Sequence, residues 1–122
     1  MAARITTTVF DAAHPAQLGE FWAEVLGWDT TTVDGHDDWV VIADPNHEAT
    51  FILLFLPGSE TKTAKNRVHL DINPVGCSQQ EELERLLSLG ARRVDIGQGE
   101  QTWFVLADPE GNEFCLLRNR VE

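Results

Sequence analysis

The chain has few cysteines, few basic residues and no long apolar run, and each scarcity excludes a class of protein. Only Cys77 and Cys115 occur among 122 residues, too few for the disulfide framework of a small secreted domain. The first residues lack the apolar core of a signal peptide, and no stretch approaches the roughly 18 apolar residues of a membrane span. We therefore expect a cytoplasmic protein with reduced thiols that does not cross a membrane.

Basic residues are outnumbered by acidic ones, 9 against 20, which gives a formal net charge of -11. A charge of this sign repels phosphate backbones and anionic lipids, so we expect neither nucleic acid nor a membrane surface as a partner. Three of the basic residues, Lys62, Lys65 and Arg67, lie close together in the sequence. They are either a solvated loop or an entrance that attracts anionic ligands.

Motifs of nucleotide-dependent enzymes and of common hydrolases are also absent from the sequence. It contains no P-loop, no dinucleotide-binding glycine motif, no CxxC pair and no serine-centred nucleophile elbow. The hydrophobic content of 43% is enough for a buried core. The length suits one domain better than two.

An internal repeat is the strongest pattern that the sequence does contain. Residues 39–45 read Trp-Val-Val-Ile-Ala-Asp-Pro and residues 103–109 read Trp-Phe-Val-Leu-Ala-Asp-Pro, identical at five of seven positions. Each segment is apolar and β-prone, ends in an Asp-Pro turn signal and is followed by a second apolar run. A repeat at about half the chain length predicts two similar modules.

A helical pattern precedes each tryptophan segment. Pro15 suits the first turn of the first helix and Gly27 suits its end. Ser78 and Glu81 form a capping box at the start of the second helix, and Gly90 suits its end. The apolar residues of the first helix recur on one face: Leu18, Phe21, Trp22, Val25 and Leu26.

Strand-like segments complete each module. They lie before each helix, at 4–10 and 67–73, and between each helix and its tryptophan segment, at 28–33 and 92–96. The order of elements is therefore β-α-β-β-β, twice.

This order predicts an α+β fold in which residues 1–122 form a single domain. Module 1 spans about 4–56, a polar linker about 57–66 and module 2 about 67–118. We expect the site for a small molecule in a cleft between the modules.

Side-chain alternation along the strand segment 68–72 selects two polar residues for that site. His69 and Asp71 share one face, whereas Val68, Leu70 and Ile72 share the other, which should pack on a helix. An unperturbed imidazole titrates near pH ~6.5, so His69 is the best candidate for proton transfer. A carboxylate on the same face orients or charges the ring. Alternatively, His69 only satisfies a buried hydrogen bond.

Further candidates come from the last strand and from the repeated tryptophans. Glu113 and Cys115 share one strand face. Cys115 is either a nucleophile, if a cation lowers its pKa, or an inert buried thiol. Glu113 is either an acid in the cleft or a solvated strand-end charge. Trp39 and Trp103 are either aromatic walls of a pocket or core residues.

Three motifs follow one another along the chain and carry a family resemblance. They are Phe21-Trp-Ala-Glu-Val-Leu-Gly-Trp28, Asn66-Arg-Val-His-Leu-Asp-Ile72 and Asp108-Pro-Glu-Gly-Asn-Glu-Phe-Cys-Leu-Leu117. Together they resemble the vicinal oxygen chelate superfamily, and within it the glyoxalase-like, bleomycin-resistance-like branch. The resemblance covers nearly the whole chain. It implies a glyoxalase/bleomycin resistance/dihydroxybiphenyl dioxygenase-like fold, with two tandem βαβββ modules forming a cup-shaped mixed sheet. Relatives often pair, so we expect a homodimer.

The resemblance also implies where a metal would bind. Enzymes of the superfamily hold a divalent ion in the cup, usually with histidine or glutamine, glutamate, histidine and glutamate. The corresponding positions here are Thr7, Leu56, with the aliphatic Leu54 on the same face, His69 and Cys115. Because this set is depleted, we expect no cofactor. The alternative is a divalent metal (Zn, Ni, Mn or Fe) held by His69 and Cys115.

These observations predict a glyoxalase-like protein that binds a small hydrophobic or aromatic molecule, such as an antibiotic-resistance-type binder. The first alternative is a lyase or isomerase that uses His69 as general base with Asp71 in support, with or without a metal. Another is a purely structural module without a pocket. Glyoxalase I activity is disfavoured, because it needs the metal. The expected ligand-binding residues are Thr7, Trp39, Leu54, Leu56, Trp103, Glu113 and Cys115.

Overall fold

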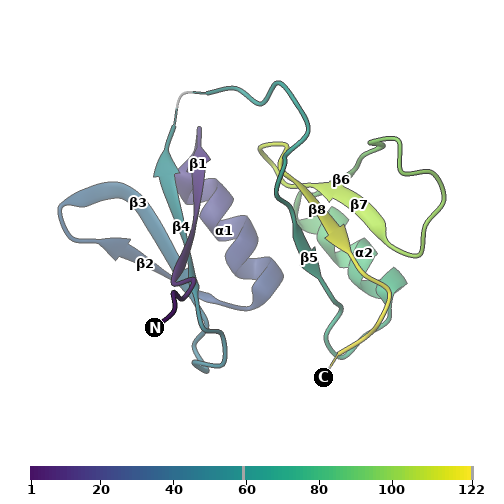
Figure 1. Cartoon of the computed structure of the whole chain (residues 1–122), viewed down its shortest axis with the longest axis horizontal. Helices are drawn as coiled ribbons and strands as arrows, with labels where there is room; N and C mark the ends of the chain where they lie inside the picture. Colours follow the sequence, from purple (N-terminus) through teal and green to yellow (C-terminus); the bar gives the residue numbers. More distant parts are fainter. Residues whose placement is uncertain (59, 122) are drawn as a thin grey trace. The chain divides into compact units, whose positions relative to one another are not determined.

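The computed structural model describes residues 1–58 and 60–121. It divides into two compact units, Met1–Thr61 and Lys62–Glu122, and each unit contains one helix and one four-stranded sheet (Figure 1). The α+β class and the repeated β-α-β-β-β order are thereby confirmed. The cup shape stays a prediction. None of the described helices has the length and apolar character needed to span a membrane.

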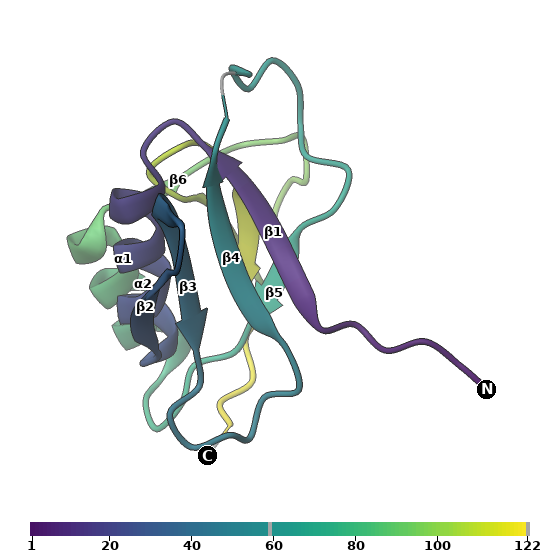
Figure 2. The same ribbon diagram turned by 90° about the vertical axis from the view of Figure 1, so that its left-hand side faces the viewer.

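The first unit has a sheet with the strand order β1-β4-β3-β2. β1 is parallel to β4, and the other pairs are antiparallel. Figure 2 shows α1 on one face of this sheet, where Leu53 and Phe55 of β4 are buried. The elements in chain order are β1 (Thr7–Ala12), α1 (Pro15–Leu26), β2 (Asp29–Val33), β3 (His36–Ala43) and β4 (Ile52–Pro57).

Helix α1 begins and ends where its proline and glycine predict. Pro15 occupies the first turn, and Gly27 adopts a left-handed φ of 69° while its N–H donates to the carbonyl of Ala23. Gly19 brings the helix close to the sheet, because a Cβ there would lie 2.8 Å from Cγ1 of Val40. Trp22 of the same helix is buried in the core.

The second unit repeats this arrangement with the strand order β5-β8-β7-β6. β5 is parallel to β8, and the other pairs are antiparallel. The predicted capping box is present, since Ser78 Oγ accepts the N–H of Glu81 at 3.1 Å and Glu81 Oε1 accepts the N–H of Ser78 at 3.1 Å. The elements are β5 (Leu70–Ile72), α2 (Gln79–Leu89), β6 (Arg92–Arg93), β7 (Phe104–Ala107) and β8 (Glu113–Leu116).

Strand β5 is shorter than the predicted segment 67–73. The register of β5 and β8 would place Val68 opposite Asn112. However, the backbone N–H and the side-chain amide of Asn112 both donate to Asp108 at 2.9 Å, which holds Asn112 in a turn. Val68 therefore has no strand partner and is 80% exposed. The prediction that Val68 packs on a helix is wrong.

The aspartates of the repeat are the centres of two turns. Asp108, which is fully buried, accepts the N–H groups of Glu110 and Asn112 at 2.9 Å. Asp44 similarly accepts the N–H of Asn46 at 2.9 Å and others nearby. The hydrogen bond from Asn46, with further backbone N–H groups, holds the pKa of Asp44 below its ordinary value. The repeated Asp-Pro pairs thus mark turns that satisfy their own backbone donors.

We expect Asp108→Ala to destabilise the fold by about 3 kcal/mol, because several donors lose a charged acceptor at a buried site. Urea unfolding followed by circular dichroism measures the change. The matched control is Asp95→Ala, which removes an exposed carboxylate that accepts the N–H of Gly97 at 2.8 Å; it should cost less than about 1 kcal/mol. Equal unfolding midpoints for the two variants would contradict the role of the buried turn.

Candidate functional site

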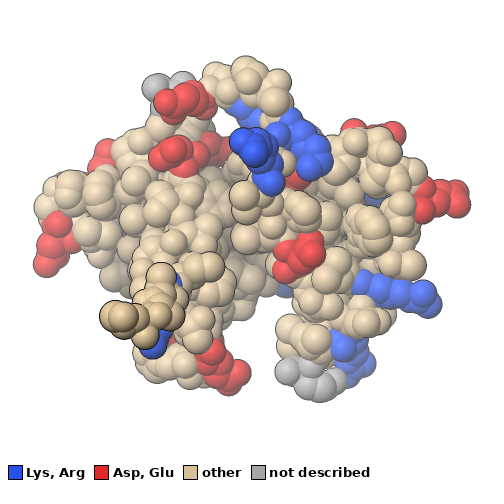
Figure 3. All heavy atoms as spheres, viewed as in Figure 1, with Lys and Arg blue, Asp and Glu red and all other residues tan. Residues whose placement is uncertain are grey.

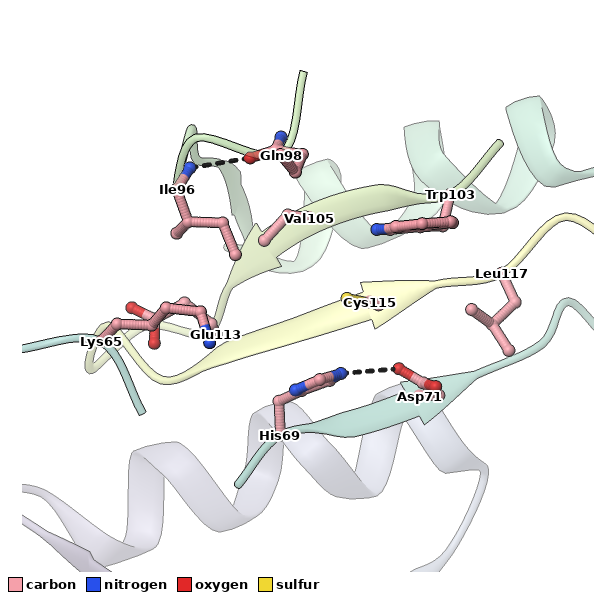
Figure 4. A pocket seen from close by; sticks show the side chains of 10 residues that line it. All are labelled: Lys65, His69, Asp71, Ile96, Gln98, Trp103, Val105, Glu113, Cys115 and Leu117. Carbon is pink, nitrogen blue, oxygen red and sulfur yellow. Dashed lines mark hydrogen bonds and ion pairs between the residues drawn. The ribbon is translucent and has the colours of Figure 1, made fainter. Parts of the chain in front are cut away.

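A pocket of about 380 Å³ opens on the second sheet, on the face opposite the buried Phe114 and Leu116 (Figure 4). All of its lining residues belong to the second unit. They are Lys65, His69, Asp71, Ile96, Gln98, Trp103, Val105, Glu113, Cys115 and Leu117. The pocket therefore gathers every site residue that was predicted in module 2.

The four site residues predicted in module 1 lie on one face of the first sheet. Thr7 on β1, Leu54 and Leu56 on β4 and Trp39 on β3 alternate with residues that face α1. Each is partly buried, and Trp39 stacks on His36 with a centroid separation of 3.8 Å. These residues do not line the pocket of the second unit, and their part in ligand binding stays a prediction.

His69 and Asp71 form the polar pair of the pocket. His69 directly precedes β5 and Asp71 lies within it, so alternation turns both side chains to the pocket face, as predicted. Nε2 of His69 lies 3.1 Å from Oδ1 of Asp71. The side chains are 43% and 49% exposed, so a molecule in the pocket has access to the ring. The carboxylate orients the imidazole, as carboxylates do in catalytic and ligand-binding histidine pairs.

Cys115 lies on β8 beside this pair and is only 7% exposed. Burial raises the pKa of its thiol, and the negative charge of Asp71 raises that pKa further. A thiolate is the nucleophilic form of cysteine, so these surroundings act against a nucleophile. The structure favours the alternative of an inert, small apolar residue.

Glu113 has a structural task at the start of β8. Its Oε1 accepts the N–H of Asn66 at 2.7 Å, and its Oε2 lies 2.9 Å from Nζ of Lys62. Lys62 also donates to the carbonyl of Ala64 and to Oδ1 of Asn66. Burial opposes the charge of Glu113, but the hydrogen bonds from Asn66 and Lys62 outweigh it and hold the pKa of Glu113 below its ordinary value. The carboxylate thus ties the segment before β5 to β8.

The basic residues that cluster in the sequence have different surroundings in the structure. Figure 3 shows basic side chains gathered over the segment between β4 and β5. Lys62 is held by Glu113, whereas Lys65 lines the pocket. The two lysines therefore differ: Lys62 belongs to the Glu113 cluster, and Lys65 is part of the pocket wall.

The apolar wall of the pocket comes from β7, the end of β8 and one loop. Trp103 directly precedes β7 and is 37% exposed, and Val105 lies two residues further on the same face. Ile96 and Gln98 belong to the loop between β6 and β7, where Ile96 N–H donates to Oε1 of Gln98 at 2.8 Å. Strand alternation from Trp103 could have predicted Val105. The predicted strand segment 92–96 included Ile96, but β6 ends at Arg93, and no sequence signal indicated that Ile96 or Gln98 lines a pocket.

The donors available for a divalent metal differ from those that the family resemblance implies. Among the described residues, His69, Asp71 and Cys115 bring one ligand atom each within 4.8 Å of one another. However, the imidazole and the carboxylate bind each other, and burial favours the protonated thiol. Leu56 offers no donor and Thr7 only a hydroxyl. The residues therefore do not fit the four-ligand centre of metal-dependent relatives.

Comparison with known proteins shows that the chain matches one family model and that its fold is similar to those of several solved structures. A family model described as a glyoxalase-like domain matches residues 7–117. No curated protein matches the chain.

Three solved structures illustrate the likeness in fold. A possible glyoxalase from Bacillus cereus is 19% identical with a TM-score of 0.67, and the match covers 95% of this chain and 99% of that one. A glyoxalase/bleomycin resistance protein/dioxygenase superfamily member from Sphaerobacter thermophilus is 14% identical with a TM-score of 0.63, and the match covers 97% of this chain and 98% of that one. An antibiotic binding protein from a Streptomyces species is 17% identical with a TM-score of 0.58, and the match covers 99% of this chain and 98% of that one. At these identities the likeness shows the fold alone.

The partly buried carboxylate of Glu113 predicts how stability depends on pH. Its folded-state pKa is lowered, so its stabilisation is complete above the unfolded-state pKa and is lost as pH falls through the folded-state pKa. We expect Glu113→Gln to be less stable than wild type by about 1–2 kcal/mol at pH 7, through loss of charge-assisted hydrogen bonds. The difference should shrink on acidification.

Urea unfolding at several pH values measures this dependence. The matched control is Glu100→Gln, which neutralises an exposed loop glutamate and should leave stability unchanged at every pH. A Glu113→Gln deficit that persists unchanged at a pH below the folded-state pKa would contradict the assignment.

Proposed function

The chain belongs to the glyoxalase-like domain family of the vicinal oxygen chelate superfamily, and from that premise we propose that it binds a small hydrophobic or aromatic molecule in the pocket of its second unit. The pocket itself carries the proposal. An apolar wall that includes Trp103 and Val105 faces one accessible polar pair, His69 and Asp71. Mostly apolar walls with a few convergent polar groups are typical of small-molecule sites.

The size of the pocket supports a ligand of modest dimensions. Its volume of about 380 Å³ lies at the lower end of the roughly 300–1,000 Å³ found for small-molecule sites. The partly exposed indole of Trp103 offers a flat apolar surface, on which an aromatic ring gains stacking energy as well as buried area. These features favour a compact aromatic ligand over a long flexible one.

Binding without turnover is supported by two further observations. Cys115 is kept in the thiol form by burial, and the residues do not fit a four-ligand metal centre. A Streptomyces relative in fold is an antibiotic binding protein, so an antibiotic-resistance-type binder remains our proposal for the biological role. The proposal also includes a homodimer in the cytoplasm. Glyoxalase I activity remains disfavoured by the depleted ligand positions.

A second candidate function is a lyase or isomerase in which His69 is the general base. The 3.1 Å contact between His69 and Asp71 favours it, because a carboxylate partner keeps the imidazole oriented for proton abstraction. In this reaction His69 would take a proton from a carbon acid in the pocket, and Asp71 would be a positioning residue.

Removal of the tryptophan tests the binding proposal. We expect Trp103→Ala to weaken the binding of quinoline, a soluble bicyclic aromatic, by about tenfold, which corresponds to about 1.4 kcal/mol of lost stacking and burial. Chemical-shift titration in NMR measures the affinity and locates the ligand at Val105 and Cys115. Leu87→Ala, on the exposed side of α2, is the control and should bind as wild type does. Shifts spread evenly over the surface would contradict the pocket.

Deuterium exchange tests the general-base alternative. Small ketones with an acidic α-carbon, incubated with the protein in D₂O, should gain deuterium with wild type and at least about 100-fold more slowly with His69→Gln. Asp71→Asn should show an intermediate rate, because the base remains but its orientation is lost. Unchanged exchange in His69→Gln, with an unfolding midpoint like that of wild type, would eliminate this alternative.

A further inference from the structure

One ring nitrogen of His69 is engaged by a neighbouring side chain of the second unit. Nε2 contacts Oδ1 of Asp71 at 3.1 Å. Figure 4 shows the second nitrogen at the opposite end of the ring, away from Asp71. Among the described residues of the second unit, 62–121, the one polar contact found for this ring is that of Nε2 with Asp71. The side chain lines the pocket and is 43% exposed, so a molecule in the pocket has access to the ring.

The carboxylate determines which kind of group Nδ1 can meet. An ionised carboxylate only accepts hydrogen bonds, so it holds the proton of a neutral imidazole on Nε2 and leaves a lone pair on Nδ1. If the ring takes up a second proton, Nδ1 becomes a hydrogen-bond donor and can bind a deprotonated oxygen of the ligand. An acidic hydroxyl suits both states, because it donates to Nδ1 of the neutral ring and, once deprotonated, accepts from Nδ1 of the charged ring.

The rest of the pocket selects the body that carries this hydroxyl. Trp103, Val105 and Leu117 provide apolar surface beside the polar pair, and an aromatic ring suits such a surface. Lys65 lines the same pocket, and its cation favours an oxygen that carries partial negative charge. The Asp71 carboxylate and the net charge of -11 act against a ligand that is already an anion in solution.

We propose that the ligand is a hydroxyl-bearing aromatic compound, of the phenol class, whose ring lies against Trp103 and whose hydroxyl hydrogen-bonds to Nδ1 of His69. This inference rests on the proposed binding function and specifies its ligand class. His69 is then the residue that sets specificity, and Asp71 is a positioning residue that keeps Nδ1 in its accepting form.

Three probes that share one ring system test the proposal: 6-hydroxyquinoline, 6-methoxyquinoline and quinoline-6-carboxylate. NMR titration should give 6-hydroxyquinoline at least tenfold higher affinity than the methyl ether, because the ether covers Nδ1 without donating a hydrogen bond. The carboxylate should bind more weakly than the hydroxyl compound. Equal affinities of the hydroxyl and methoxy compounds would overturn the phenol assignment and leave the binding pocket standing.

Two variants separate the hydrogen bond from the apolar contact. His69→Phe should abolish the preference for the hydroxyl compound while the methyl ether binds as before. Asp71→Asn should reduce the preference without moving the ligand, since an amide can also donate to the ring and shift its proton to Nδ1. His36→Phe, in the first unit, is the matched control and should keep the full preference. Urea midpoints close to that of wild type establish that each variant is folded.

The remaining outcomes are also decisive. Tightest binding of quinoline-6-carboxylate would overturn the inference in favour of an anion site at Lys65. A preference for the hydroxyl compound that survives in His69→Phe would overturn the role of Nδ1. If none of the three probes nor quinoline binds to the pocket, the proposed function fails, and the ligand class fails with it.

Discussion

The parallel pairing of β5 with β8 is the constraint on which the pocket depends. It places Asp71 opposite Cys115 and Leu70 opposite Phe114, so that the polar residues of both strands emerge on one face and the apolar residues enter the core. Strand alternation has a period of two, so a shift of one residue would turn His69 and Asp71 toward α2. The hydrophobic core on the other face, which includes the buried Phe114 and Leu116, prevents that shift.

Charged groups around this pairing divide into structural and accessible ones. Glu113 and Lys62 bind each other, and Asn66 completes the cluster, so their charges hold the chain in place before β5. His69 and Asp71 also bind each other but remain partly exposed. The pocket therefore presents a preoriented polar pair and the Lys65 side chain against an apolar wall, which suits selective binding more than promiscuous hydrophobic capture.

Much of the second unit was predictable, and the exceptions have physical causes. The capping box at Ser78 and the strand alternation that turns Asp71 to the pocket depend on neighbours within a few residues, and both are present as predicted. The exposure of Val68 was not predicted, because Asn112, which would pair with Val68, is held in a turn by its hydrogen bond to Asp108. Ile96 was missed as a pocket residue because the sequence predicted a strand over 92–96, whereas β6 ends at Arg93 and Ile96 lies in the loop that follows.

The sequence by itself determined the two modules, the helix ends and the faces of the residues within β5 and β8, because periodicity and local hydrogen bonds encode these features. Only the tertiary structure decided the chemical state of the side chains. The thiol of Cys115 is buried beside a carboxylate, and the carboxylate of Glu113 binds Lys62 across 51 positions of sequence. Those contacts join segments that lie far apart in the chain, and local patterns carry no information about them.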